Sequence, residues 1–535
     1  MNLLNFKRPQ RYIGNEWNVV KKDHTNKIKI CISYPDIYEV GMSNLGLRII
    51  YGMLNEFTNV VCERVFLPGE DYIKYLINNN SKLVSLETKT PIDEFEVIGF
   101  NLNYELNFIN FLYILHLGKI PLYAKDRKNL VMVGGIANPL PLNNFVDVFF
   151  LGEFEEKIYE FVNVLSKYKD KEERLKVLSE IDGFFVPKFY SIYIKNNKYN
   201  FEKIYPYAKL PVKRVFVKNL DQVYYPLKWL TPHTKIVHDR ASVEIARGCP
   251  NGCSFCQARS IYKPYREKKI STICDQIQKI YNYSGYESFS LLALSASDYS
   301  RIEKLIDEVL YLFKENKIGL SLPSLRIDDV IGFLYKKLIP HKKTSLTVAL
   351  EVANDNLRNK LNKKIDIKKL FETAKILNSL KIQHLKIYFM FGFKEETEED
   401  LIAIGDFLEK LNKEAKIRIN TSINAFIPKP FSMWQNIPMQ EESILENKQK
   451  IILKYINNKK IKVSISSIEK SVLEAFLSRG DDKLDKFLYK IFIRSLKEEN
   501  YNFYFNWKDI ATEENLDYRF YIYQPQDNFP WSFIN

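Results

Sequence analysis

The chain has 535 residues, which at roughly 150 residues per domain predicts three to four domains. Hydrophobic residues make up 46%, and 36 Phe and 34 Tyr are too many apolar anchors for a largely disordered protein. Six cysteines are too few for a disulfide-dense secreted scaffold, and no apolar run reaches the roughly 18 residues of a membrane-spanning helix. Because the first residues also lack a signal-peptide core, we expect a cytoplasmic, multidomain protein without a membrane partner.

The formal net charge of +14 would suit a partner such as nucleic acid. Lysine is nevertheless spread along the whole chain among Asn and Ile, in segments such as IKNNKYN and YINNKKIKV. This pattern indicates a compositional bias, because solvated faces are the usual place for lysine. The charge pattern therefore does not support a nucleic-acid partner, although it leaves one open.

The first part of the chain alternates strand-like and helical segments. Strand-like runs lie at 27–36, 60–68, 83–87, 96–102, 130–135 and 146–153, with helical spacing at 41–57 and 71–77 and from residues 106 and 153. The alternation predicts parallel crossovers and a doubly wound sheet of Rossmann or flavodoxin type, with ligands outside the carboxyl ends of its strands. No G-x-G-x-x-G motif occurs, so a dinucleotide site is not supported.

A second, more regular series follows an aromatic segment from Phe184 to Tyr207 that predicts a hairpin extension. Its strand-like segments lie at 242–248, 289–297, 319–327, 345–352, 384–392 and 417–428, and Thr397 with Asp400 has the spacing of a helix capping box. Six such strands predict a partial (β/α)6 barrel of TIM type, in which chemistry collects at the carboxyl ends of the strands. From about Glu441 we expect helices and an aromatic tail.

Three of the six cysteines form a C-x3-C-x2-C triplet directly after the first strand of this second series. Cys249, Cys253 and Cys256 are too closely spaced for chance, and intracellular thiolates hold metal far more often than they form disulfides. Three thiolates in one loop suit a [4Fe–4S] cluster with one iron left open for catalysis. We therefore predict these three cysteines as metal ligands.

Zinc is the alternative metal at this triplet, and it would require a fourth ligand. The nearest candidates are His233 and His238 upstream and Cys274 downstream. Cys274 falls in a helical pattern, where a small core residue is the simpler interpretation.

The triplet, with Phe255 before its last cysteine and a six-fold βα series around it, resembles the signature of radical S-adenosylmethionine (SAM) enzymes. The resemblance implies that the three cysteines hold a [4Fe–4S] cluster and that SAM chelates the fourth iron. Carried over by position, the implied SAM contacts are Phe255, Ser295, Ser297, Arg326, Glu351, Gly392 and Pro428.

These contacts have separate implied roles. Phe255 would lie against the adenine, and Ser295 to Asp298 would replace the usual glycine-glycine-glutamate turn that binds the SAM amino group, a departure from the family pattern. Arg326 would pair with the SAM carboxylate and Glu351 would accept from the ribose hydroxyls, unless the two form a structural ion pair with each other.

Segments outside the triplet, among them YPDIYEVGMSNLG, GGIANPLPL and LSRGDDKL, resemble a family of radical SAM proteins with a cobalamin-binding-like N-terminal domain and no assigned substrate. The implied division is a cobalamin-binding-like α/β domain at 1–183, a hairpin and linker at 184–234, the radical SAM core at 235–465 and a helical region with an aromatic tail at 466–535. The cobalt-ligating D-x-H-x-x-G motif is missing. Either cobalamin binds without a protein histidine, or, as we expect, the domain has kept the fold and lost the cofactor.

The resemblance implies an enzyme that takes an electron from a flavodoxin-type or ferredoxin-type donor and reductively cleaves SAM. The resulting 5′-deoxyadenosyl radical would remove a hydrogen atom from a substrate that the sequence does not identify. The segment IPKPFSMWQ loosely resembles methylthiotransferases, but the chain has no second three-cysteine set for an auxiliary cluster. Cobalamin-dependent methyl transfer is one alternative, and a non-catalytic iron–sulfur module that binds RNA or protein is another.

Overall fold

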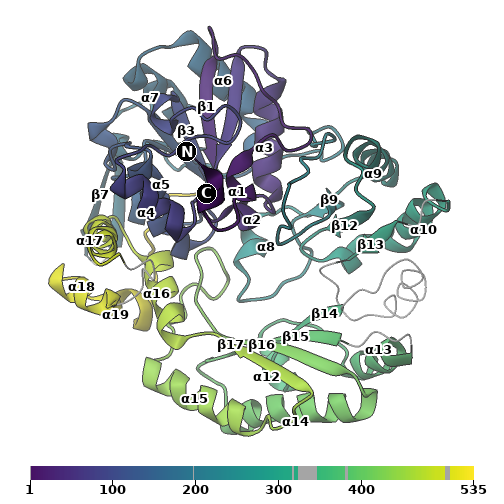
Figure 1. The fold of residues 1–535 in the computed structure, drawn as a ribbon. Coiled ribbons are helices and arrows are strands. Elements are labelled where there is room, and N and C mark those ends of the chain that lie inside the picture. Colours follow the sequence, from purple (N-terminus) through teal and green to yellow (C-terminus); the bar gives the residue numbers. More distant parts are fainter. Residues whose placement is uncertain (1, 197, 316–317, 323–345, 380–383, 500–505) are drawn as a thin grey trace.

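Five parallel strands and one short antiparallel strand form the N-terminal sheet (Figure 1). The structure is a computed structural model that describes residues 2–196, 198–315, 318–322, 346–379, 384–499 and 506–535. The strands are β1 (Ile28–Ser33), β2 (Val60–Val65), β3 (Val97–Asn101), β4 (Leu130–Gly134), β5 (Val148–Phe150) and β6 (Phe184–Phe185). Their order, β2-β1-β3-β4-β5-β6, is of flavodoxin type over the parallel strands and confirms the predicted fold class.

Helices pack against this sheet. Their bounds are α1 (Gln10–Ile13), α2 (Tyr38–Gly41), α3 (Leu45–Glu56), α4 (Glu70–Asn78), α5 (Phe108–Leu117), α6 (Ile158–Lys167) and α7 (Lys171–Ser179). The helix predicted at 41–57 is divided, because the Asn44 side chain accepts a hydrogen bond from the Leu47 N–H at 2.9 Å and so begins α3. The strand predicted at 83–87 is wrong, since Val84 makes only an isolated bridge and the Glu87 side chain turns inward to Arg64.

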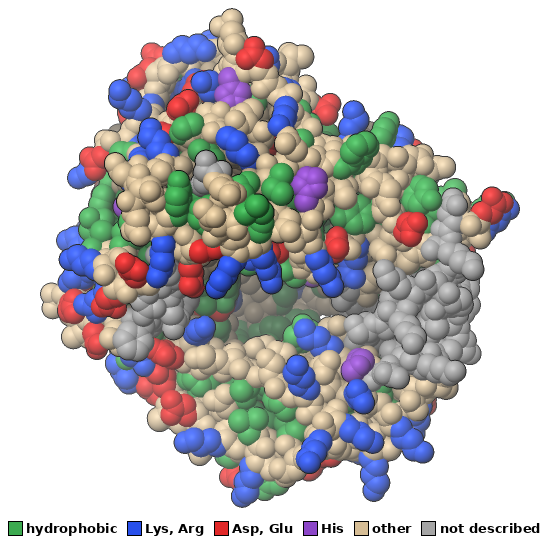
Figure 2. Space-filling view, in the orientation of Figure 1, with side chains coloured by type: hydrophobic (Ala, Val, Ile, Leu, Met, Phe, Trp, Pro, Cys, Tyr) green, Lys and Arg blue, Asp and Glu red, His purple; other side chains and the backbone are tan. Residues whose placement is uncertain are grey.

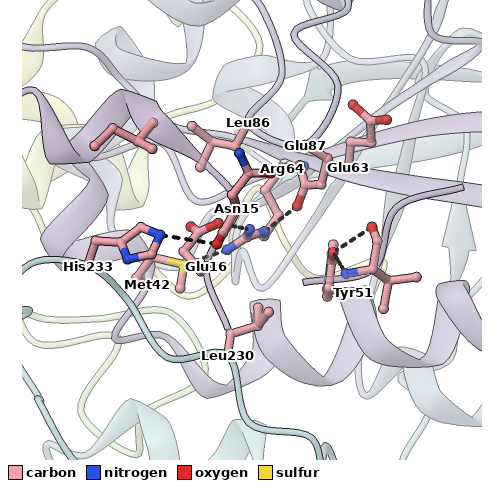
Figure 3. Close-up of polar contacts among 12 residues, drawn as sticks. Asn15, Glu16, Met42, Tyr51, Glu63, Arg64, Leu86, Glu87, Leu230 and His233 are labelled. Atoms are coloured by element: carbon pink, nitrogen blue, oxygen red, sulfur yellow. Dashed lines mark hydrogen bonds and ion pairs between the residues drawn. The ribbon is translucent and has the colours of Figure 1, made fainter. Parts of the chain in front are cut away.

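A buried ion network anchors the N-terminal segment to strand β2 (Figure 3). The Arg64 guanidinium, fully buried, lies 2.6 Å from Glu87 Oε1 and 3.0 Å from Glu16 Oε2. Glu16 also accepts from the Tyr38 hydroxyl at 3.0 Å. Burial opposes ionisation of Glu16, but the Arg64 guanidinium outweighs it and holds the pKa of this carboxyl below its usual value.

We expect Glu16→Gln to lower the free energy of unfolding by about 1–3 kcal/mol, because a charge-assisted hydrogen bond to Arg64 is lost while Glu87 remains. The contribution of Glu16 is present above the ordinary carboxyl pKa of 4.5 and is lost as the pH falls through the lower folded value. Urea denaturation at neutral and acid pH measures both effects. Lys82→Met, which breaks an exposed ion pair with Asp93, is the control and should cost less than about 1 kcal/mol.

Two parallel sheets make up the predicted barrel region, one of order β13-β12-β9 and one of order β14-β15-β16-β17. Their strands are β9 (Ala241–Glu244), β12 (Ser288–Leu292), β13 (Gly319–Ser321), β14 (Leu346–Glu351), β15 (His384–Phe391), β16 (Arg418–Ala425) and β17 (Ile461–Ile465). The prediction that the chain is helical from Glu441 is wrong at β17, where alternating Ile461, Val463 and Ile465 add a strand beside β16.

Helices of this region include α9 (Ile270–Ser284), α10 (Ile302–Leu312), α12 (Asp355–Lys360), α13 (Ile367–Ser379), α14 (Glu398–Ala415) and α15 (Glu442–Lys454). The capping box predicted at Thr397 and Asp400 begins α14. A groove separates the lobe that holds β14 to β17 from the rest of the molecule (Figures 1 and 2). Among the described helices, none combines the length and the apolar character needed to cross a bilayer.

The C-terminal region joins the two halves of the molecule. It contains α16 (Ile468–Arg479), α17 (Leu484–Lys497), α18 (Trp507–Glu513) and α19 (Tyr518–Tyr523). The Tyr113 hydroxyl on α5 lies 2.8 Å from Ser495 Oγ on α17, and Arg479 Nη1 donates to the Gln435 carbonyl at 2.6 Å. The C-terminal tail also contacts the linker, because Ile534 forms an isolated β-bridge with Val212. This linker follows the hairpin of β7 (Tyr190–Lys195) and β8 (Lys198–Lys203).

Candidate active site at the cysteine loop

The three predicted metal ligands lie in one loop between β10 (Ala246–Arg247) and α8 (Gln257–Ile261), at the carboxyl end of the first barrel strand. Gly248 opens the loop with φ of +84°. A Cβ at this glycine would lie 2.6 Å from the Tyr262 carbonyl oxygen and 2.8 Å from that of Pro264. Both the backbone angle and the close approach therefore require glycine directly before Cys249.

Gly248→Ala is expected to displace the cysteine loop, to lower the iron content per chain, and to cost about 1–3 kcal/mol of stability. Gly285→Ala is the matched control, because Gly285 has a similar φ of +70° but nothing within 4 Å of an added Cβ. The control should carry only the cost of the backbone angle and should keep the iron content of the wild type. Equal iron loss in both variants would show that close approach at Gly248 is unimportant.

Backbone contacts from two distant segments fix the loop. The Ser254 N–H donates to the Leu361 carbonyl at 3.0 Å, and the Trp434 N–H donates to the Ser254 carbonyl at 3.1 Å. The Asn362 side chain donates to the Gly252 carbonyl at 2.9 Å. The loop is thus held between the segment after α12 and the segment after β16.

The three thiols open into one cavity of about 910 Å³, within the range of ligand sites in proteins. No three His, Cys, Asp or Glu side chains in the described part of the chain are arranged to hold a single metal ion. In a [4Fe–4S] cluster each thiolate binds a different iron, so the ligands need to surround a common space rather than meet at one point. Three half-buried thiols around one cavity fit that requirement.

Burial raises the pKa of the Cys253 and Cys256 thiols, and the nearby Lys363 ammonium partly opposes the rise. Both thiols therefore stay protonated at neutral pH without a metal, and metal binding would release their protons. Asn251 approaches the third thiol, with its Nδ2 lying 3.5 Å from Cys249 Sγ and 2.5 Å from Asp298 Oδ2. This contact links the cysteine loop to the turn after β12.

Three predicted SAM contacts line the same cavity: Phe255, Ser295 and Glu351. Ser295 is 5% exposed and its hydroxyl has no hydrogen-bond partner within the described residues, as expected of a group that awaits a ligand. Phe255 packs on a small apolar cluster that includes Phe393 and Trp434. The cavity therefore offers an apolar wall and an unsatisfied hydroxyl beside the thiols.

Glu351 ends β14 at a bulge, with φ of +69°, a strained angle for a residue with a side chain. Burial raises the pKa of this carboxyl, and Lys363 Nζ at 3.2 Å opposes the rise. Sequence reasoning missed Lys363 because it is one of many scattered lysines. The pair that Glu351 forms is with Lys363, and Arg326, its other expected partner, lies outside the described residues.

Of the remaining predicted contacts, the described ones, Gly392, Pro428 and Ser297, are not among the residues that line the cavity. The positive φ of Gly392, +93°, accompanies close packing, since a Cβ there would lie 2.5 Å from Leu445 Cδ2. Pro428 is buried and its carbonyl accepts from Arg479 Nη1 at 3.4 Å, while Ser297 follows Ser295 in the turn away from the cavity lining. Of the alternative zinc ligands, Cys274 packs against the core from α9 and His233 contacts the Asn15 carbonyl at 3.1 Å.

A charge clamp joins the cysteine loop to the N-terminal domain. We use this name for Arg247 and its partners: Nη1 lies 3.0 Å from Glu153 Oε2, and Nη2 lies 2.9 Å from both Glu155 Oε1 and Glu244 Oε2. Arg266 adds a contact of 2.8 Å to Glu153 Oε1. Burial alone would lower the pKa of Arg247, but the nearby carboxylates outweigh burial and raise it. The residue two positions before Cys249 is therefore fixed by a different domain.

A second cavity, of about 430 Å³, lies beside the clamp where β1 and β3 of the N-terminal sheet end, the switch point of this topology. Apolar residues of β1, β3 and α3 line it, and the Ser33 hydroxyl, fully buried, has no hydrogen-bond partner within the described residues. This lining fits a flat, apolar part of cobalamin, but no imidazole of the described residues lines the cavity to ligate cobalt. Leu294 lines both cavities, so the two adjoin.

Two protein-family models match the chain, one for the N-terminal region of radical SAM proteins over 46–187 and one for the radical SAM superfamily over 243–408. Together they span more than half of the sequence. The chain belongs to the radical SAM superfamily. The cofactors of this superfamily are a [4Fe–4S] cluster and SAM, and the cysteine-lined cavity lies within the second match.

The chain is also similar in sequence to individual proteins. The chain is 27% identical over 465 residues to an uncharacterized protein of Methanocaldococcus jannaschii, covering 86% of this chain and 90% of that protein. It is 26% identical over 274 residues to the ribosomal protein uS12 methylthiotransferase RimO of Desulfotalea psychrophila, covering 48% of this chain and 56% of that protein.

Among solved structures, the radical SAM methyltransferase TsrM of Kitasatospora setae, with cobalamin and a [4Fe–4S] cluster bound, aligns with a TM-score of 0.55. The alignment covers 91% of this chain and 99% of TsrM at 11% identity, so it shows a shared fold. This chain is a radical SAM enzyme whose N-terminal sheet, barrel and helical C-terminal region follow the expected fold class.

Proposed function

We propose that this radical SAM enzyme reductively cleaves SAM in the 910 Å³ cavity and directs the product radical at a substrate held in the same cavity. One observation supports the proposal above all: three half-buried thiols line the same cavity as the buried Ser295 hydroxyl, which has no hydrogen-bond partner within the described residues. When bound and reduced, the cluster and SAM supply methionine and a 5′-deoxyadenosyl radical.

Within this proposal each side chain has one task. Cys249, Cys253 and Cys256 hold the cluster, and Ser295 accepts a hydrogen bond from the SAM amino group. Glu351 accepts from the ribose hydroxyls, and its ion pair with Lys363 opposes the rise that burial causes in the pKa of this carboxyl. The apolar cluster behind Phe255 keeps water from that side of the cavity.

The same proposal includes a cytoplasmic location, a flavodoxin-type or ferredoxin-type electron donor, and the domain division at 183, 234 and 465. The end of β17 at Ile465 supports the boundary at 465, while β6 (Phe184–Phe185) continues the first sheet two residues beyond 183.

The test is anaerobic purification followed by reduction with dithionite in the presence of SAM. We expect brown protein with stoichiometric iron and sulfide, and release of 5′-deoxyadenosine measured by liquid chromatography. Colourless protein that contains zinc, or iron-loaded protein that releases no 5′-deoxyadenosine, would overturn the proposal.

A second candidate, cobalamin-dependent methyl transfer, is favoured by one observation: the 430 Å³ cavity adjoins the SAM cavity at Leu294. TsrM, which shares the fold, is described as a methyltransferase with cobalamin bound. Titration with cobalamin decides, because binding changes the visible absorbance of the corrin. A Ser33→Leu variant would fill part of the 430 Å³ cavity and should abolish any change in absorbance that the wild type shows. If the wild type itself shows no change in absorbance, this candidate function is removed.

A further inference from the structure

The cysteine-lined cavity has a second, cationic end. It continues between the two sheets of the barrel to the amino-terminal ends of the strands, where Lys235, Arg240 and Lys386 line it. Arg240 directly precedes β9, and Lys386 is the third residue of β15. The cysteine loop, by contrast, follows the carboxyl end of the barrel strands.

The register of the four-stranded sheet extends this cationic end across its inner face. Lys386 lies beside Thr347 of β14 and Asn420 of β16, and Asn420 lies beside Lys462 of β17. These residues are partly or fully exposed, whereas the alternate residues of β15 and β16 are buried. The row therefore faces the space between the sheets and presents two cations and two uncharged hydrogen-bonding groups.

The composition of this face changes towards the cysteine loop. The next row consists of Ala349, Tyr388, Ser422 and Ser464, and the row before carries His384 and Arg418. Positive charge thus collects at the amino-terminal ends of the strands, and uncharged polar groups follow. The residues named on these rows include no carboxylate, and Glu351, which lies beside Phe389 and lines the cavity, is paired with Lys363.

The cations at this end have no carboxylate partner within the described residues. Arg240 Nη1 makes only a long contact of 3.4 Å to Ser321 Oγ, and its Nε is buried without a partner. Lys386 Nζ lies 4.7 Å from the centre of the Tyr388 ring. The cavity lining also contains Asp239, which is exposed and accepts from the Tyr286 hydroxyl at 3.3 Å. Arg247 and Lys363, which lie beside the cysteine loop, are each paired with a carboxylate, whereas within the described residues no carboxylate pairs Arg240 or Lys386.

We infer that the substrate carries a phosphate group bound by Arg240 and Lys386, and that it presents an uncharged part to the cysteine end of the cavity. This inference rests on the proposed function only for the uncharged part of the substrate, which would react at the cysteine end. A planar guanidinium and an ammonium together match a doubly charged phosphate better than a single carboxylate. Because β15 rises about 3.3 Å per residue, Lys386 and the end of the strand at Phe391 are separated by roughly 16 Å. SAM fills the cysteine end of this length, so the phosphate lies at the end of the cavity far from the cluster.

The charge pattern along the chain contains no sign of this site, because only the fold brings its cations together. Lys386, Arg418 and Lys462 are separated by more than 30 residues each, and parallel pairing alone places Lys386 and Lys462 in one row and Arg418 in the row before it. Lys and Arg side chains also gather along the upper rim of the groove that faces this sheet (Figure 2).

Binding to the full-length protein tests the inference without reductant, so that it does not depend on SAM cleavage. The probes are uridine, UMP and a single-stranded oligouridylate of ten residues, measured by calorimetry with SAM present to fill the other end. We expect UMP or the oligouridylate to bind the wild type at least about tenfold more tightly than it binds Arg240→Met/Lys386→Met. Tighter binding of the oligouridylate identifies a nucleic-acid strand as the source of the phosphate, and equal or tighter binding of UMP identifies a small phosphorylated compound.

The matched control is Lys279→Met/Lys375→Met, which removes two exposed cations from the outer helices α9 and α13. It should bind the probes as the wild type does. Lys386→Gln, a single change on a partly exposed face, provides a second variant if the double variant fails to fold, and should weaken binding at least about threefold. Unchanged affinity in these variants, no phosphate-dependent binding in the wild type, or equal binding of uridine and UMP would overturn the inference. Failure to release 5′-deoxyadenosine would instead overturn the proposed function and leave the binding result intact.

Discussion

Cys253→Ala is expected to abolish both cluster incorporation and the release of 5′-deoxyadenosine, while the chain still folds. The loop that carries Cys253 is held by backbone contacts to Leu361 and Trp434 that do not involve the thiol. Loss of one sulfur from a half-buried position should cost on the order of 1 kcal/mol of stability. Two remaining thiolates cannot hold three irons of a cluster, so the chemical loss is complete.

Cys274→Ala is the matched control for this prediction, because Cys274 is also half-buried and free but lies on α9 outside the cavity lining. Iron and sulfide per chain, with 5′-deoxyadenosine measured on the same samples, should be at wild-type values in the control and absent in Cys253→Ala. Wild-type iron in Cys253→Ala, or the same loss in both variants, would refute the assignment of the triplet.

Arg247→Met is expected to lower the free energy of unfolding by about 3–5 kcal/mol and to reduce the iron content of the purified protein. The change leaves the partly buried Glu155 and Glu244 without the guanidinium that they share, and Glu153, which is buried, keeps only Arg266 among its clamp partners. Because Gly248 and Cys249 follow directly, the cysteine loop loses its fixed start. Stability is measured by urea denaturation and loading by iron analysis.

The pH dependence of the clamp gives a second measurement. Burial opposes ionisation of Glu153, but Arg266 and Arg247 outweigh it and hold the pKa of this carboxyl below its usual value. Its contribution is therefore present above the ordinary pKa of 4.5 and is lost as the pH falls through the lower folded value. Arg247→Met should flatten this acid dependence, whereas Lys279→Met, which breaks an exposed pair with Asp275, should leave it unchanged. A variant as stable as wild type, with wild-type iron, would mean that the clamp does not position the loop.

Local signals in the sequence predicted much of the fold and the centre of the site. Strand periodicity located β1, β3, β4, β15 and β16, and cysteine spacing located the loop that opens into the cavity. Both are short-range patterns that a single segment contains. The strand predicted at 83–87 is wrong because the last residue of the segment does not fit an apolar strand. The Glu87 side chain turns inward and its carboxylate accepts a hydrogen bond from Arg64. Strand β17 was missed because its five residues follow a lysine-rich turn.

Long-range pairing accounts for what the sequence could not predict. Lys363 enters the site only because α12 and the turn after it lie against the cysteine loop. Two of the three partners of Arg247, Glu153 and Glu155, come from a loop almost one hundred residues earlier, and nothing in the order of residues links Glu155 to Cys249. Gly392 and Pro428 were expected at the cofactor from their places at strand ends; Gly392 packs against Leu445 and the Pro428 carbonyl accepts from Arg479, and their contact with a cofactor stays a prediction.

We propose that three thiolates of one loop hold a cluster whose remaining iron binds SAM. This is tested most directly by the electron paramagnetic resonance spectrum of the dithionite-reduced, anaerobically purified protein before and after addition of SAM. We expect a single [4Fe–4S]⁺ signal whose g-values change when SAM binds the open iron. A reduced cluster whose signal SAM leaves unchanged, or the absence of any such signal from iron-loaded protein, would contradict it.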